Sequence, residues 1–223
     1  MPDSVSPIER VIRPRSEARV AYNRLSRWYD ALSESSERPG RHAAVGMLAV
    51  QPGESALEVG CGTGHSVRAL GTVTDRVRGL DISDGMLAVA RVRLRRAGLD
   101  GQVALEQGDA ANLPYADGSF DALLMTFALE LFDTPEIPLV LGECRRVLRP
   151  AGRLAVAAMS RAAGASLVLL LYEWAHRRFP ASVDCRPIFA QAMLEENGFC
   201  TVRVERLSMW GLPVEVVLAR RSM

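Results

Sequence analysis

The sequence contains no lysine, because all 27 basic residues of this 223-residue chain are arginines. This absence excludes a Schiff-base lysine, a pyridoxal-phosphate anchor and a lysine-dependent phosphate-binding loop. Cysteine is also scarce. The four cysteines, Cys61, Cys144, Cys185 and Cys200, form no Cys-x-x-Cys pair. We therefore expect neither a metal site nor a disulfide framework.

Long apolar runs and charge of one sign are missing too. The apolar stretch at residues 166–171 is far shorter than the ~20 residues needed to span a bilayer. The charged N-terminus lacks the apolar core of a signal peptide. The formal net charge of +1 creates no overall field that would attract nucleic acid. The sequence predicts a cytoplasmic protein with no nucleic-acid partner and no integral membrane association.

What the chain does contain is an alternation of strand-like and helical patterns. Strand-like segments lie near residues 55–59, 76–81, 103–107, 119–126 and 153–159, and helical segments near 64–71, 84–97 and 135–148. Strands separated by helices indicate parallel βαβ units. Two further strand-like runs, 199–206 and 213–219, are close enough to pair antiparallel. We expect an α/β fold: a Rossmann-like seven-stranded sheet, mostly parallel with an antiparallel last strand, and helices on both faces.

One additional segment precedes this pattern, and another is inserted before its last two strands. Residues 1–50 read as an N-terminal helical arm, with helices at 17–32 and 42–50 and a polar loop at 33–40. The main domain then covers 51–223. It contains an insertion at about 161–189, with one helix at 163–178, and is followed by another helix at 187–197. Ser83 is expected to cap the helix at 84–97, and Gly98 to end it.

The segment LEVGCGTGHS, residues 57–66, predicts a strand that runs into a glycine-built turn. Glycines at 60, 62 and 64 allow a sharp turn and let a ligand approach the backbone. The helix that follows offers free N–H groups and the positive end of its dipole. In an open parallel sheet, ligands bind in this crevice.

Three acids distinguish this loop from a dinucleotide site, whose spacing is Gly-x-Gly-x-x-Gly. Glu58 precedes the first glycine, and Asp81 ends the second strand, where it could accept ribose hydroxyls. Asp81 alone would also suit an NAD enzyme. Asp109 ends the third strand and could accept the exocyclic amine of adenine. Together they fit an adenosine that carries a cationic sulfonium rather than a pyrophosphate.

Four segments now support a resemblance: LEVGCGTGHS, GLDIS, GDAANLPYADGSFDALLMTFALELF and RRVLRPAGRLAV. In this order they resemble the motifs of class I S-adenosylmethionine-dependent methyltransferases. The chain is most like the small-molecule group that includes the ubiquinone and menaquinone biosynthesis methyltransferases. The resemblance covers roughly residues 17–160 and implies in-line transfer of a methyl group to a small, apolar acceptor. One departure is Ala151, where the family often has glycine in a turn.

The resemblance also implies a cofactor site for S-adenosylmethionine. The amino-acid part of the cofactor would lie against the loop residues Gly60, Gly62 and Gly64, with Glu58 and Cys61 beside them. Asp81 would hold the ribose, and the adenine would lie among Ile82, Met86, Asp109 and Ala110. Thr126, Phe127 and Leu131 would lie beside the methyl group.

The helix at 17–32 would form a lid in this family. Tyr22 or Tyr29 would close over the cofactor, with Arg27 or Arg41 near its carboxylate. The alternative is that the aromatic side chains simply pack this helix onto the sheet, which is the commoner use of aromatics at helical spacing.

The insertion at 161–189 lies where this family builds its substrate cover. His176 and Asp184 within it, and Glu130 after the fourth strand, are candidate general bases. The alternatives are that the first two cap helices or pair with arginine, and that Glu130 faces solvent. A base is needed only if the acceptor arrives protonated. An NAD-dependent oxidoreductase and a catalytically silent S-adenosylmethionine-binding protein are the other functions that the sequence leaves open.

Overall fold

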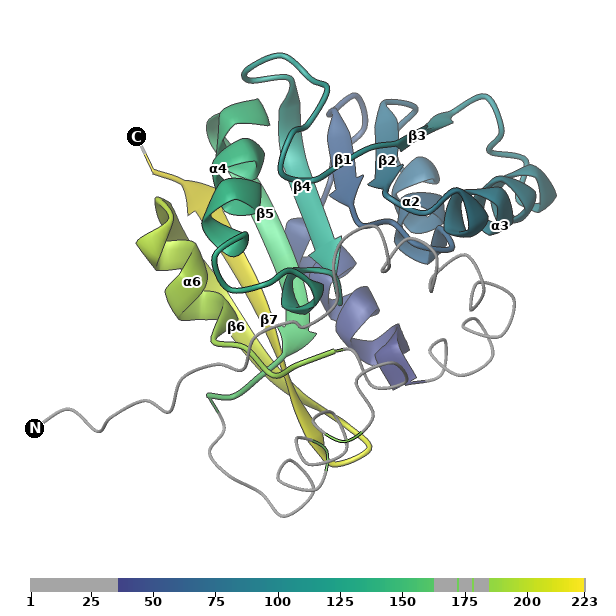
Figure 1. Cartoon of the computed structure of the whole chain (residues 1–223). Coiled ribbons are helices and arrows are strands. Elements are labelled where there is room, and N and C mark those ends of the chain that lie inside the picture. Colours follow the sequence, from purple (N-terminus) through teal and green to yellow (C-terminus); the bar gives the residue numbers. More distant parts are fainter. Residues whose placement is uncertain (1–35, 163–171, 173–177, 179–184, 223) are drawn as a thin grey trace, which may run out of the picture.

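The computed structural model describes residues 36–162, 172, 178 and 185–222. Within these ranges seven strands form one sheet in the order β3-β2-β1-β4-β5-β7-β6 (Figure 1). The strands are β1 (Ala56–Val59), β2 (Val77–Asp81), β3 (Val103–Gln107), β4 (Phe120–Thr126), β5 (Leu148–Met159), β6 (Phe199–Met209) and β7 (Leu212–Arg221). Strand β7 runs antiparallel to both of its neighbours, whereas the pairs among β1 to β5 are parallel. The predicted fold class is confirmed.

The helices alternate with the strands as expected. They are α2 (His65–Gly71), α3 (Asp84–Arg96), the 3-10 turn η1 (Leu129–Leu131), α4 (Ile137–Val147) and α6 (Ala190–Glu196). Residues 36–48 form another helix. Ser83 caps α3 by accepting the Met86 N–H at 3.1 Å, and Gly98 follows the helix with φ of 71°. Both boundary predictions for α3 are therefore confirmed.

Helices cover both faces of the sheet because the strand side chains alternate in direction. Leu57 and Leu123 pack in one core with α4 and α6. Ala56 and Leu124, next to them in sequence, belong to a second core with helix 36–48, α2 and α3. The parallel strands therefore bury both faces, and their carboxyl ends meet at one edge of the sheet (Figure 1).

Helix 36–48 corrects the prediction of a polar loop at 33–40, because residues 36–40 are helical. Pro39 and Gly40 disfavour a helix locally, but Ala44 and Leu48 are fully buried against the sheet. Gly40 also suits this position, since a Cβ there would come within 2.9 Å of the Phe127 ring. Tertiary packing thus outweighs the local preference.

The last three strands are longer than predicted. Strand β5 begins at Leu148 rather than near 153, and it contains Ala151 at φ of 61°. Strands β6 and β7 extend to a tip at Trp210 and Gly211, which both have positive φ. Two such residues suit the right-handed twist of a tight hairpin.

Several predictions fall outside the described residues. These are the arm at 1–16, the helix at 17–32 and most of the helix at 163–178, of which Tyr172 and Arg178 are described and helical. The boundary between residues 1–50 and 51–223 stays a prediction. In the ranges that are described, the helices are too short or too polar to cross a membrane.

Candidate functional site

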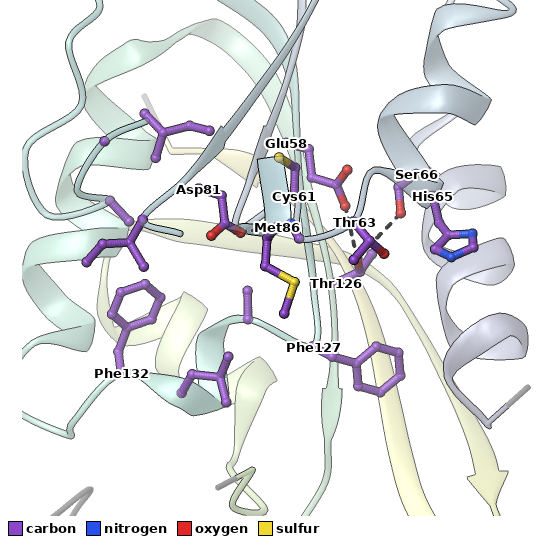
Figure 2. Close-up of a pocket in the computed structure, with 18 of the residues that line it drawn as sticks. Glu58, Cys61, Thr63, His65, Ser66, Asp81, Met86, Thr126, Phe127 and Phe132 are labelled. Atoms are coloured by element: carbon purple, nitrogen blue, oxygen red, sulfur yellow. Dashed lines mark hydrogen bonds between the residues drawn. The ribbon is translucent and has the colours of Figure 1, made fainter. Parts of the chain in front are cut away.

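A pocket opens at the carboxyl ends of β1, β2 and β4, beside helix 36–48 (Figure 2). Twelve of the thirteen described residues expected at a cofactor line it, and Gly64 is the exception. The remaining lining residues are Glu37, Arg41, Thr63, His65, Ser66, Leu80, Gly108, Ala128, Phe132 and Glu136. The pocket therefore brings together the ends of strands that are far apart in sequence.

The structure requires glycine at the three loop positions for different reasons. All three have positive φ: 73° at Gly60, 51° at Gly62 and 84° at Gly64. A Cβ on Gly60 would lie 2.6 Å from Ala128, and one on Gly64 would lie 2.8 Å from Ala90 of α3. A Cβ on Gly62 would meet nothing within 4 Å. Gly62 thus leaves its backbone open to the pocket, whereas Gly64 permits two helices to approach.

Asp81 fixes this loop through both carboxylate oxygens. Its Oδ2 accepts the Gly62 N–H at 2.8 Å, and its Oδ1 accepts the Ser83 N–H at 2.8 Å. Burial raises the pKa of this carboxyl, while the two N–H donors oppose that rise. Each carboxylate oxygen has a second lone pair, so Asp81 can hold the loop and still accept a ligand hydroxyl.

Asp109 occupies the corresponding place after β3. Its Oδ1 accepts the Ala111 N–H at 2.9 Å, which stabilises the turn after the strand. Asp109, Ala110 and the preceding Gly108 line the same pocket as Ile82 and Met86. The second and third acids that the sequence singled out are thus near one another, with apolar side chains beside them.

Glu58, the first acid, lies on the pocket wall in a short chain of polar side chains. Thr126 Oγ1 donates to Glu58 Oε1 at 3.0 Å, and Ser66 Oγ lies 3.4 Å from Thr126 Oγ1 (Figure 2). Burial raises the pKa of Glu58 to about 7, although the Thr126 hydrogen bond and, more weakly, the charge of Arg41 oppose the rise. Glu58 Oε2 has no hydrogen-bond partner.

An apolar wall follows β4. Phe127 has φ of 53° and donates its N–H to the Ala157 carbonyl at 2.7 Å. A bulky residue in this left-handed conformation is costly and often marks a functional site. Leu131 and Phe132 extend the wall. Phe132 was not among the residues that sequence reasoning selected, although it directly follows Leu131.

Glu130 directly precedes Leu131 in the sequence but does not line the pocket. Its side chain is fully buried, and Oε1 accepts the Met159 N–H at 3.2 Å. Burial raises the pKa of Glu130 to about 8. The alternative that Glu130 faces solvent is wrong. The other candidate bases, His176 and Asp184, lie outside the described residues, as do Tyr22 and Tyr29.

Sequence reasoning missed some residues near the glycine loop and at the far end of the pocket. Thr63, His65 and Ser66 belong to the loop and the first turn of α2, so their position beside the glycines was an available signal. Glu37 and Glu136 carry no such signal, since only the folded chain brings helix 36–48 and the start of α4 to the pocket.

Comparison with known proteins defines the class first. A family model described as a methyltransferase domain matches residues 56–152, which include the glycine loop and all three acids. The chain is also similar in fold to magnesium protoporphyrin IX methyltransferase from Synechocystis PCC 6803 with bound SAH. That structure is 20% identical, with a TM-score of 0.74 over 94% of this chain and 100% of the other.

Curated relatives then narrow the class. A demethylmenaquinone methyltransferase from Parafrankia sp. (strain EAN1pec) is 36% identical over 178 residues, which are 72% of this chain and 69% of the relative. A second, from Tropheryma whipplei (strain Twist), is 40% identical over 149 residues, or 65% of this chain. The match spans 60% of that relative's length. The chain belongs to the class I S-adenosylmethionine-dependent methyltransferases of the ubiquinone and menaquinone type.

Proposed function

We propose that this protein transfers a methyl group from S-adenosylmethionine to a small, apolar acceptor of the quinol type. The carrying observation is a pair of buried polar atoms of opposite charge on the pocket wall. Glu58 Oε2 and Arg41 Nη2 both lack a hydrogen-bond partner, although Arg41 Nη2 lies 3.8 Å from Glu37 Oε2. A buried polar atom without a partner is expensive, so a ligand that supplies both partners would be stabilised.

The amino-acid end of S-adenosylmethionine fits this pair. Its ammonium would lie at Glu58 and its carboxylate at Arg41, which both line the pocket beside the glycine loop. Asp81 would accept the ribose hydroxyls, and Asp109 with Ala110 would meet the adenine edge. All five residues line the same pocket, which supports a single elongated ligand rather than two.

When bound, S-adenosylmethionine supplies a methyl group that its sulfonium already activates. The chain has to align the acceptor with that group and exclude water. Phe127, Leu131 and Phe132 provide an apolar wall for this purpose. A quinol hydroxyl must lose its proton before it or the adjacent ring carbon can react well. Glu130 does not line the pocket, so it is not placed to take that proton.

The curated relatives support the class of acceptor, since both are named for demethylmenaquinone. A general base at His176 or Asp184 stays part of the proposal. The proposal also places the enzyme in the cytoplasm, where its buried Cys61 and Cys144 thiols would stay reduced.

Two measurements test the proposal. Titration calorimetry with S-adenosylhomocysteine should give a dissociation constant in the micromolar range, and NADH should give no heat. A labelled-methyl assay with 1,4-naphthohydroquinone should then yield a methylated product. Absence of binding at millimolar S-adenosylhomocysteine would contradict the proposal. Tight binding without transfer to any quinol would instead favour the silent binding protein.

A further inference from the structure

Both described ends of the insertion at 161–189 return to the segment that follows β4. On the outgoing side, the Met159 N–H donates to Glu130 Oε1 at 3.2 Å. The two ends also bind each other: Ile188 N–H donates to Met159 O at 2.9 Å, and Arg161 N–H donates to Ile188 O at 3.0 Å. The start and the return of the insertion are therefore one unit at the end of β5.

Arg186 makes the second connection. Its side chain is only 2% exposed. Nη1 donates to Thr134 Oγ1 at 2.9 Å, and Nη2 donates to the Phe132 carbonyl. Since Phe132 lines the pocket, a residue at the return of the insertion holds the backbone of the pocket wall directly.

Two buried charged residues, Glu130 and Arg186, and the partly buried Thr134 form what we call the polar cluster. The charge of Arg186 acts on Glu130, and so does the charge of Glu37, which lines the pocket. Burying a guanidinium and a carboxyl is costly, and apolar residues of similar size often give an equally stable core. Stability alone is therefore a weak reason for this cluster, and the hydrogen bond from Arg186 to the Phe132 carbonyl points to a role at the pocket wall.

We propose that Glu130 and Arg186 are positioning residues that set acceptor selectivity, by fixing the Leu131–Phe132 wall relative to the ends of the insertion. The inference rests on the proposed function, because it assumes that the wall contacts the acceptor. Neither residue lines the pocket, so neither is expected to touch the cofactor. Their loss should change how the acceptor binds and leave S-adenosylhomocysteine binding intact.

The test compares Arg186→Met with a matched arginine elsewhere. Arg146 also ties loop carbonyls together, donating to Tyr115 O at 2.7 Å and Leu113 O at 3.0 Å, and neither of these residues lines the pocket. Arg146→Met therefore controls for lost stability. Glu130→Gln keeps an oxygen that can accept the Met159 N–H, whereas Glu130→Met removes it.

For Arg186→Met and Glu130→Met we expect the KM for 1,4-naphthohydroquinone to rise about tenfold, and preference between it and its 2-prenyl derivative to shrink. The affinity for S-adenosylhomocysteine should change less than about twofold. Glu130→Gln should stay near wild type, and so should Arg146→Met. Unchanged KM and preference in Arg186→Met would overturn the proposal, as would an equal effect in Arg146→Met.

Hydrogen exchange provides a readout that needs no turnover. Arg186→Met should accelerate amide exchange both at 185–188 and at 131–136, whereas Arg146→Met should accelerate it near 113–118. Acceleration confined to 185–188 would show that the wall is not coupled to the insertion and would overturn the proposal. If wild type binds no S-adenosylhomocysteine, the proposed function fails, and the exchange result still decides whether the coupling exists.

Discussion

Two buried glutamates at the same edge of the sheet allow the two halves of the site to be compared. Glu58 lies one residue before the end of β1 and Glu130 follows β4, and these residues are 1% and 0% exposed. In each, one oxygen accepts a hydrogen bond and the other has no partner. Burial raises both pKa values, to about 7 and about 8.

The two glutamates differ in what lies in front of them. Glu58 lines the pocket, whereas Glu130 does not, although its neighbours Leu131 and Phe132 do. Glu58 therefore borders the space that a ligand would occupy, while Glu130 does not. The two glutamates are equally buried and have similar pKa values, but we assign them different roles. Glu58, which lines the pocket, would bind the ligand, and Glu130, which does not, would position the wall.

The largest effect that this comparison predicts is at the cofactor half. Asp81→Ala removes the acceptor of the Gly62 and Ser83 N–H groups and the proposed ribose partner. The affinity for S-adenosylhomocysteine should fall at least about 100-fold, or roughly 3 kcal/mol, by calorimetry. Asp121→Ala is the control, since Asp121 accepts the Ser55 N–H at 2.9 Å away from the pocket. A loss smaller than about threefold in Asp81→Ala would separate this acid from cofactor binding.

Glu58 should ionise when a cationic ligand arrives. Because its pKa is about 7 in the free protein, binding of the ammonium should release a proton near neutral pH. The affinity for S-adenosylhomocysteine should rise between about pH 6 and pH 8, and the binding enthalpy should depend on the ionisation heat of the buffer. Glu58→Gln should abolish both dependences and weaken binding about tenfold at pH 8.

Glu130→Gln serves as the matched variant for this experiment. It removes a buried carboxyl of similar pKa that does not line the pocket, so proton release on binding should persist. If proton release disappeared in Glu130→Gln and persisted in Glu58→Gln, the roles assigned to the two glutamates would have to be exchanged.

Glu130 should instead affect how the unfolding free energy of the free protein depends on pH. Its raised pKa means that the folded state keeps the proton over a range where the unfolded state has lost it. The stabilisation is complete below the unfolded pKa of 4.5 and is lost as the pH rises through about 8. Glu130→Gln should therefore make the fall in unfolding free energy between about pH 5 and pH 8 shallower, by roughly 1.4 kcal/mol per pH unit.

Chemical denaturation at three pH values in this range measures that slope. Glu143→Gln is the control, because the Arg146 hydrogen bond lowers the pKa of Glu143 and its contribution changes only at lower pH. An unchanged slope in Glu130→Gln would mean that the carboxyl is already ionised in the folded protein.

The smallest effect lies outside both halves of the site. Ala151 has φ of 61°, a conformation in which glycine is less strained than alanine. Ala151→Gly should stabilise the protein by about 1 kcal/mol and leave binding unchanged. Ala69→Gly, within α2, should destabilise it by about 1 kcal/mol. A destabilised Ala151→Gly would indicate that the Ala151 methyl group packs favourably enough to offset the strain.

The sequence could predict residues that line the pocket from β1 to β4 because their determinants are local. Asp81 ends a strand with a readable pattern, Gly62 and Asp109 follow such strands, and parallel strands bring their ends together. The acceptor half depends on contacts among residues far apart in the chain, such as Phe132 with Arg186 and Glu130 with Met159. No local pattern encodes those pairs. The helix at 36–40 was missed for the same reason, since burial against the sheet overrides its Pro-Gly pair.

The contact between Gly64 and Ala90 has a geometric consequence for the adenine end of the pocket. Gly64 has no Cβ and Ala90 has only a methyl group, so the start of α2 can lie close to α3. Met86 stands one turn before Ala90 on the same face of α3, so this separation also determines how far Met86 lies from the glycine loop. A larger residue at 64 or 90 would widen the gap between the two helices. Binding of the flat adenine base would then weaken, although the larger residue itself would not contact that base.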